Sequence, residues 1–459
     1  MSVAARPPVR GTAPGQADPP DRSAPGHPER DRVIDLLRVG SVGIVVLMHW
    51  VTPLIVLTGG QVRVEILPTG PVTWVASWFI QVMPVIFLAG GVANTAVVRT
   101  MRDRGQPYSG YLVSRARRLV LPVAVLVGVV GVVSTALAGL GAPGLGVAVS
   151  LGTAKPLWFV AVYLLVVALA PGLVAAQRRF GLAVPAAFAA AAVTVDLLRF
   201  NGVAEVAPLN LGFVWLFAHQ LGVAYALGTL RAARPRTLLA LVLGAGATCL
   251  LMVTVGPYPP AMIGLRDVPV SNLAPPTAAL VVLAVAQFAV ITWLGRRFGP
   301  VLATPAWVRR LELANRPVMT VYLWHLPAMI LLIGVGLAAP EVLLPPAGVE
   351  WWATRPLWLV GCVLLLAFLV RVFHRVEAAP ALRLPFAVPA GARPVMAVTG
   401  VGLAMVAVDQ IWRHGMLLFG PEATASGPAV LSLWLAVVLL GRPSAPSDAR
   451  SVGGIDGRF

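Results

Sequence analysis

Apolar runs of about twenty residues recur along the chain, and short polar connections rich in arginine separate them. About 20 apolar residues are enough for a helix to cross the hydrocarbon core of a bilayer, so we interpret each run as a membrane span. The predicted spans cover residues 33–57, 73–98, 119–139, 156–175, 182–198, 210–230, 237–255, 277–294, 317–337, 356–373, 394–410 and 426–441. The pattern predicts an all-α, polytopic transmembrane helical bundle.

The arginines gather in every second connection between the predicted spans. Representatives of these clusters are Arg102, Arg115, Arg178, Arg234 and Arg309. The remaining connections hold scattered arginines accompanied by acidic residues. Cytoplasmic loops of membrane proteins carry an excess of Lys and Arg, so we expect a multi-pass protein of a cytoplasmic (inner) membrane with both termini in the cytoplasm.

The two ends of the chain differ from the spans in composition. Residues 1–31 are rich in Pro, Gly, Arg and Asp and lack the apolar region of a signal peptide. We expect them to form a disordered cytoplasmic tail, and residues 442–459 to form a second one. Two predicted outer connections, 256–276 and 337–356, are longer than simple turns. They are either ordered lids or poorly packed connectors.

The chain has a formal net charge of +17, although only 12% of its residues are charged and 58% are hydrophobic. A strong positive charge attracts nucleic acid, but arginines in short clusters between spans are typical of membrane topology. We therefore expect no nucleic acid partner. Cys249 and Cys362 lie in apolar runs and are interpreted as small buried hydrophobes. No cluster has zinc-ligand spacing, so no metal site is predicted.

Three ionisable residues, Asp35, Arg38 and His49, stand in the first predicted span. Arg38 and His49 are eleven residues apart, which places them within about 20° around a helix and roughly 16 Å apart along its axis. Asp35 shares the face of Arg38 at i, i+3 and is able to pair with it. Ionisable residues inside a span indicate a functional site by default. A neutral imidazole takes a proton from a hydroxyl, so His49 is a candidate general base; a packed, hydrogen-bonded histidine is the alternative.

Five short motifs follow one another along the chain. They are Arg-x10-His over 38–49, MPVIFLAGG over 83–91, YLVSRARRLVLP over 111–122, KPLWFVAVYL over 155–164 and MTVYLWHLP over 319–327. In this order they resemble the integral-membrane acyltransferase family 3, O-acyltransferases that modify sugars, cell-wall polymers and some antibiotics. The likeness covers roughly residues 31–375. Ala89 replaces the serine of the family's second motif, and further segments are similar to an actinobacterial branch.

The resemblance implies a ten-helix acyltransferase core over residues 32–375, followed by two additional C-terminal spans over 376–441. It also implies an acyl-CoA donor that approaches from the cytoplasm, with no bound cofactor. The acceptor would be a hydroxyl of a glycan, a lipid-linked sugar or a small molecule, as in O-acetylation of the cell envelope. The lipid bilayer is the remaining expected partner.

The same resemblance gives roles to individual residues. His49 would act as the catalytic base, and Arg38, its catalytic companion, would bind the donor or set the polarity around His49. Arg115 and Arg118, one helical turn apart, would bind the donor phosphates through their planar guanidinium groups; ordinary positive-inside charge is the alternative. Trp158 and His325 are possible cavity-lining residues, as is Asp35, and a packed histidine is the alternative for His325.

A secondary transporter or exporter with twelve spans is the competing interpretation. A major-facilitator carrier would have a Gly-x-x-x-Asp-Arg-x-Gly-Arg-Arg signature after its second span. This chain has MRDRGQPYSG there, over 101–110, which lacks the pattern. A third possibility is a non-catalytic membrane partner that kept the fold. Arg38 and His49, both retained, favour the enzyme.

Overall fold

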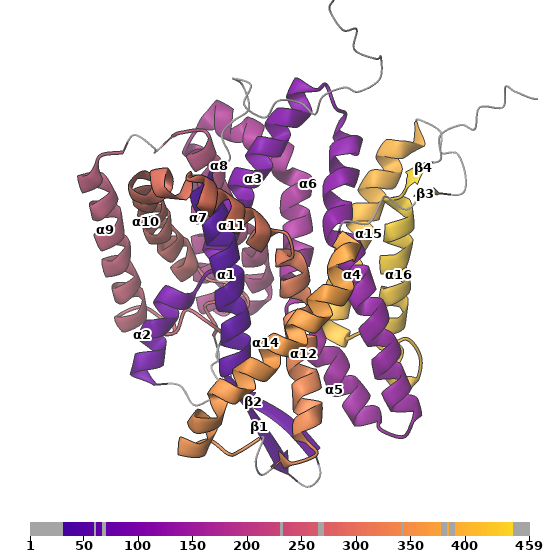
Figure 1. The fold of residues 1–459 in the computed structure, drawn as a ribbon. Helices are drawn as coiled ribbons and strands as arrows, with labels where there is room; N and C mark the ends of the chain where they lie inside the picture. The colour runs from indigo at the N-terminus through magenta and orange to yellow at the C-terminus, as the bar shows by residue number, and fades with distance from the viewer. Residues whose placement is uncertain are drawn as a thin grey trace, which may run out of the picture. The chain divides into compact units, whose positions relative to one another are not determined.

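Long apolar helices dominate the computed structural model of the protein (Figure 1), which describes residues 31–58, 61–66, 70–229, 233–264, 270–340, 344–377, 383–384 and 391–443. Eleven helical segments of this described part are long and apolar enough to cross a membrane, which confirms a polytopic all-α bundle. Apart from Asp31 and a short strand at 442–443, the two predicted tails lie outside the described residues.

The helices follow the predicted spans closely, with several shorter elements between them. They are α1 (Arg32–Val51), α2 (Pro71–Ile80), α3 (Met83–Asp103), α4 (Tyr108–Gly139), α5 (Pro143–Ala154), α6 (Leu157–Phe180), α7 (Ala183–Phe200), η1 (Ala204–Leu209), α8 (Asn210–Ala226), α9 (Pro235–Thr254), α10 (Ala278–Leu302), α11 (Pro305–Asn315), α12 (Val318–Gly336), α14 (Val349–Glu377), α15 (Ala392–His414), η2 (Pro421–Ala423) and α16 (Ser426–Leu439). The last helix has 14 residues, roughly 21 Å. It is therefore shorter than the twelfth predicted span.

The first predicted span was too long, because α1 ends at Val51 and a β-hairpin follows it. Strands β1 (Pro53–Thr58) and β2 (Gln61–Ile66) pair in antiparallel register, and β3 (Arg383–Leu384) pairs with β4 (Arg442–Pro443) elsewhere. Proline has no N–H to continue a helix, and the β-branched residues after it favour strands. His49 consequently lies two residues from the end of α1, about 3 Å along the axis.

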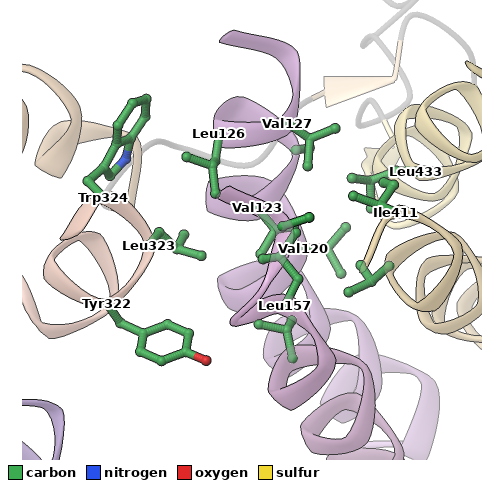
Figure 2. Close-up of a cluster of buried hydrophobic side chains, with 14 of the residues drawn as sticks. Val120, Val123, Leu126, Val127, Leu157, Tyr322, Leu323, Trp324, Ile411 and Leu433 are labelled. Carbon is green, nitrogen blue, oxygen red and sulfur yellow. The ribbon is translucent and has the colours of Figure 1, made fainter. Parts of the chain in front are cut away.

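Helix α4 lies at the centre of a large hydrophobic cluster that also includes the two C-terminal helices. Figure 2 shows Leu126 of α4 facing Leu323 of α12 on one side, and Val127 facing Ile411 and Leu433 on the other. Ile411 and Leu433 come from α15 and α16. The helices that follow residue 375 therefore pack into the same core as those that precede it.

The described part of the long connection 256–276 is packed against the bundle and is not a loose connector. The buried Asp196 carboxylate of α7 accepts hydrogen bonds from the Tyr258 hydroxyl at 3.1 Å and the Ala278 backbone N–H at 2.6 Å. Burial and the neighbouring Asp196 charge raise the pKa of Tyr258, which keeps its hydroxyl a donor. The Nδ2 of Asn272 donates to the carbonyls of Pro259 and Ala261 at 2.7 and 2.9 Å.

Helices α3 and α8 cross so closely that glycine is required on both. A Cβ atom added at Gly222 of α8 would overlap the carbonyl of Leu88, and one added at Gly91 of α3 would overlap the carbonyl of His219. Small residues let membrane helices approach to backbone contact. Gly91 ends the motif whose serine position holds Ala89, which is buried in the hydrophobic cluster around this crossing.

We expect Gly222→Ala to destabilise the protein by roughly 1–3 kcal/mol or more, because the added methyl group forces the two backbones apart. Gly212→Ala is the matched control on the same helix, since nothing lies within 4 Å of a Cβ there. Thermal unfolding of both variants in one detergent measures the difference. A Gly222→Ala variant as stable as Gly212→Ala would contradict this description of the crossing.

Candidate functional site

Two histidines that are 276 residues apart in the sequence meet between α1 and α12. The Nε2 atom of His325 lies 3.0 Å from the Nδ1 atom of His49, and the two ring centroids are 5.0 Å apart. His325 is fully buried, whereas His49 is half-buried. The fold thus brings the candidate base and the candidate cavity-lining histidine into one hydrogen-bonded pair.

The hydrogen-bond partners fix where the protons of this pair lie. The Nδ1 atom of His325 is 2.6 Å from the carbonyl oxygen of Tyr322. A carbonyl only accepts, so Nδ1 of His325 carries the proton and its Nε2 lone pair accepts from Nδ1–H of His49. His49 is then left with a free lone pair on Nε2.

Three hydrogen bonds outside the pair hold it in place. The indole Nε1 of Trp50 donates to the carbonyl of His325 at 2.9 Å, and the Nε1 of Trp358 on α14 donates to the carbonyl of Trp50 at 3.0 Å. The Tyr322 hydroxyl donates to the carbonyl of Pro156, just before α6, at 2.7 Å. Four helices are therefore connected through the backbone and side chains around the two imidazoles, which limits their rotation.

Arg38 and His49 face the interior of the bundle. The exposed side of α1 is formed by Leu36, Gly40, Gly43 and Leu47. Arg38 and His49 each follow an exposed leucine by two residues, about 200° around the helix, and so point the opposite way. Both are half-buried. Each therefore keeps some accessible surface, although it points away from the exposed leucines of α1.

The described contacts of Asp35 lie at the start of α1, beside α11. Its buried carboxylate lies 3.5 Å from Arg32, whose guanidinium is also 3.2 Å from Glu312 on α11. The Nδ2 atom of Asn315 donates to the Asp35 carbonyl at 3.4 Å. These contacts attach α11 to the first turns of α1. Pairing of Asp35 with Arg38, and a cavity-lining role for Asp35, stay predictions.

The two arginines expected to bind the donor lie on α4, away from the histidine pair. Arg115 is half-buried, its Nε atom is enclosed and has no hydrogen-bond partner among the described residues, and Arg118 is exposed. One turn before Arg115, the Tyr111 hydroxyl donates to the carbonyl of Val167 at 3.0 Å. Val167 is eleven residues beyond Pro156, roughly 16 Å along α6. Within the described chain, no contact joins these arginines to the histidines.

Trp158 belongs to an aromatic group beside the histidine pair. Its ring centroid is 5.9 Å from that of Trp215 on α8 and 6.3 Å from that of Phe159. Phe159 contacts Tyr322 at 5.6 Å, and Tyr322 contacts His325 at 6.0 Å. Trp158 is half-buried, and its predicted cavity-lining role stays a prediction.

Sequence reasoning missed the residues that hold the pair, although signals for them exist. Trp50 directly follows the candidate base, and Tyr322 stands three residues before His325 in a motif that was noted. No local sequence pattern marks Trp358, because its role depends on a hydrogen bond to a residue 308 positions away. Among the described residues, no group of three His, Cys, Asp or Glu side chains is placed to hold a metal ion.

Comparison with known proteins gives one match. The model of a family described as an acyltransferase domain, of acyltransferase family 3, matches residues 31–373, about three quarters of the chain. Comparisons with curated proteins and with solved structures found no match. The matched region contains both histidines, Arg38 and the arginine pair of α4, and it ends within α14.

Proposed function

The chain belongs to acyltransferase family 3, and from this premise we propose that it is an acyl-CoA-dependent O-acyltransferase, of the actinobacterial-type branch, whose base is His49. The family match and the eleven apolar helices establish a multi-pass membrane acyltransferase. The observation that supports the finer assignment is the hydrogen bond between His49 and His325, which leaves the Nε2 lone pair of His49 free. The family match also disfavours the transporter.

The proposed reaction needs one proton to move out and back. The acceptor hydroxyl donates to Nε2 of His49 while its oxygen attacks the carbonyl carbon of the acyl thioester. The tetrahedral intermediate then collapses, the carbon–sulfur bond breaks, and the imidazolium returns the proton to the leaving thiolate. The products are the O-acyl ester and free CoA. His325 accepts from Nδ1–H throughout, which stabilises the positive charge that develops on His49.

The proposed substrates approach from opposite ends of the bundle. Arg38 lies roughly 16 Å from His49 on the same face of α1. The arginines of α4 follow Tyr111, which contacts Val167, and Val167 lies farther along α6 than Pro156. Cations at that end suit the phosphates of acyl-CoA arriving from the cytoplasm. The acceptor, a hydroxyl of a glycan, a lipid-linked sugar or a small molecule, then arrives from the end of the hairpin β1–β2, where α1 terminates.

Acyl-CoA turnover by the purified protein in nanodiscs tests this function. Free CoA would be followed with short-chain acyl-CoA donors and a panel of hydroxylated acceptors, including sugars, sugar phosphates and small alcohols. Release that depends on an acceptor is the expected result. Absence of both turnover and acyl-CoA binding would contradict the proposal.

We expect Arg115→Ala to raise the KM for acyl-CoA by about tenfold or more, because a charge-assisted phosphate contact is lost. The KM for the acceptor should change little. Arg104→Ala is the matched control, since Arg104 is exposed and belongs to the preceding arginine cluster. If both variants show the same donor KM as the native protein, Arg115 does not bind the donor and contributes only to the positive-inside charge of the cytoplasmic loops.

A further inference from the structure

Arg355, near the start of α14, is a buried cation that has no carboxylate partner among the described residues. Only 4% of its surface is exposed. Its guanidinium carbon lies 4.2 Å from the ring centroid of Trp351 and 4.8 Å from that of Trp358. Its Nε donates to the carbonyl of Trp351 at 3.2 Å, while its Nη1 is enclosed and makes no hydrogen bond within the part of the chain that the structure describes. The side chain is therefore held in position with part of its donor fork unused.

Such an arrangement costs folding free energy unless something compensates it. Burying a charge without an opposite charge is strongly unfavourable, and an enclosed donor without an acceptor adds to the cost. The two indole rings offset part of this cost through cation–π contacts. These contacts supply no hydrogen-bond acceptor to the enclosed Nη1 of the guanidinium group. An anion that enters beside Arg355 supplies both the missing charge and the missing acceptor.

Arg355 is linked to the histidine pair through Trp358 and Trp50. Trp358, which stacks on its guanidinium, donates to the carbonyl of Trp50, and Trp50 in turn donates to the carbonyl of His325. Arg355 lies one turn before Trp358 on α14. It is thus joined to the proposed reaction site through two indole rings.

A second cation, on another part of the fold, is linked to the same histidine pair. Lys155, the only lysine of the chain, stands at the junction of α5 and α6 and is exposed. It lies within Coulombic reach of His49. The Pro156 carbonyl beside it accepts from the Tyr322 hydroxyl, next to His325. The predicted topology places Lys155 and Arg355 on the side of the membrane where cations are scarce, so ordinary positive-inside charge does not account for them.

We infer that Arg355 and Lys155 form an anion-recognition site for the acceptor, which carries a carboxylate or phosphate group near the hydroxyl that is acylated. The assignment of this anion to the acceptor rests on the proposed acyltransferase function, whereas anion binding itself does not. The planar fork of Arg355 binds two oxygens of the anion, and Lys155 adds a point charge. The anion is thereby fixed while the hydroxyl reaches Nε2 of His49.

Calorimetry on the native protein in nanodiscs, with no acyl donor present and in a phosphate-free buffer, tests anion binding separately from turnover. The probes are glucuronate, glucose 1-phosphate and glucose, which share a sugar ring and differ in charge. We expect at least one of the two anionic probes to bind about tenfold or more tightly than glucose. The preferred anion distinguishes a carboxylate from a phosphate on the natural acceptor.

Variants assign the binding to the two cations. Arg355→Gln should lose the preference for the anionic probe, and Arg355→Lys, which keeps the charge without the fork, should retain part of it. Lys155→Gln removes an exposed charge and should weaken the anionic probe while the protein stays folded. Arg413→Gln is the control, because Arg413 is an exposed arginine paired with Asp409 on α15.

Two results would overturn the inference. The first is equal binding of glucose and both anionic probes by the native protein. The second is an anion preference that survives both Lys155→Gln and Arg355→Lys undiminished, which remains decisive if Arg355→Gln does not fold. The anion site and the acyltransferase function can also fail separately. If the variants lose the anion preference but the native protein shows no acyl transfer, the anion site is supported and the proposed acyltransferase function is contradicted.

Discussion

Replacing His49 with alanine is expected to reduce acyl transfer by roughly 10²–10⁴-fold, the usual contribution of a positioned general base. His49 faces the interior of the bundle with accessible surface, and its Nδ1–H is committed to His325. The Nε2 lone pair is therefore the atom available to take the acceptor's proton. Removing the imidazole leaves the substrates bound but the hydroxyl unactivated, so kcat should fall far more than donor affinity. Acceptor-dependent release of free CoA measures the effect.

Two further variants separate loss of the base from loss of structure. His49→Gln keeps a side chain of similar size and hydrogen-bonding ability but has no basic nitrogen, so it should be as inactive as His49→Ala. His374→Ala removes an exposed histidine of α14 and should be fully active. The melting temperature of all three should stay close to that of the native protein. A His49→Gln variant within tenfold of native turnover would rule out His49 as the base.

Most of the fold was predictable because the bilayer imposes one simple requirement on the sequence. A spanning segment needs about 20 apolar residues. Runs of this length are visible in the sequence because arginine clusters separate them. The hairpin after α1 was missed because PLIVLT is as apolar as a helix. Pro53 and the Gly-Gly pair at 59–60 were nevertheless signals for a turn between two strands. The length of the apolar run alone could not distinguish a continuing helix from a β-hairpin.

The candidate site was predictable in its members and not in its geometry. His49 and His325 were each recognisable as ionisable residues inside a span. Nothing in either segment shows that they meet, because their contact joins residues 276 positions apart. The hydrogen bonds that Trp50 and Trp358 donate depend on the same long-range packing of α1, α12 and α14. Arg355 looked like one scattered arginine, and only its burial between two indoles distinguishes it.

His325→Ala is expected to lower kcat on the order of 10²-fold while the KM for acyl-CoA stays nearly unchanged. His325 does not face the substrates, since it is fully buried. It acts through His49, by accepting Nδ1–H and so directing the free lone pair of Nε2 toward the acceptor. Without it, the imidazole of His49 is free to rotate and to exchange tautomers. His325 is in this sense a positioning residue.

A conservative variant distinguishes this role from simple packing. The side-chain oxygen of His325→Gln is able to accept from Nδ1–H of His49, so it should restore part of the kcat that His325→Ala loses. His219→Gln is the control, because His219 is equally buried but contacts Asn94 of α3 at 3.3 Å and neither residue of the pair. It should lower the melting temperature and leave kcat per folded molecule unchanged. If His325→Gln were as slow as His325→Ala, and both lost stability like His219→Gln, His325 would only fill space.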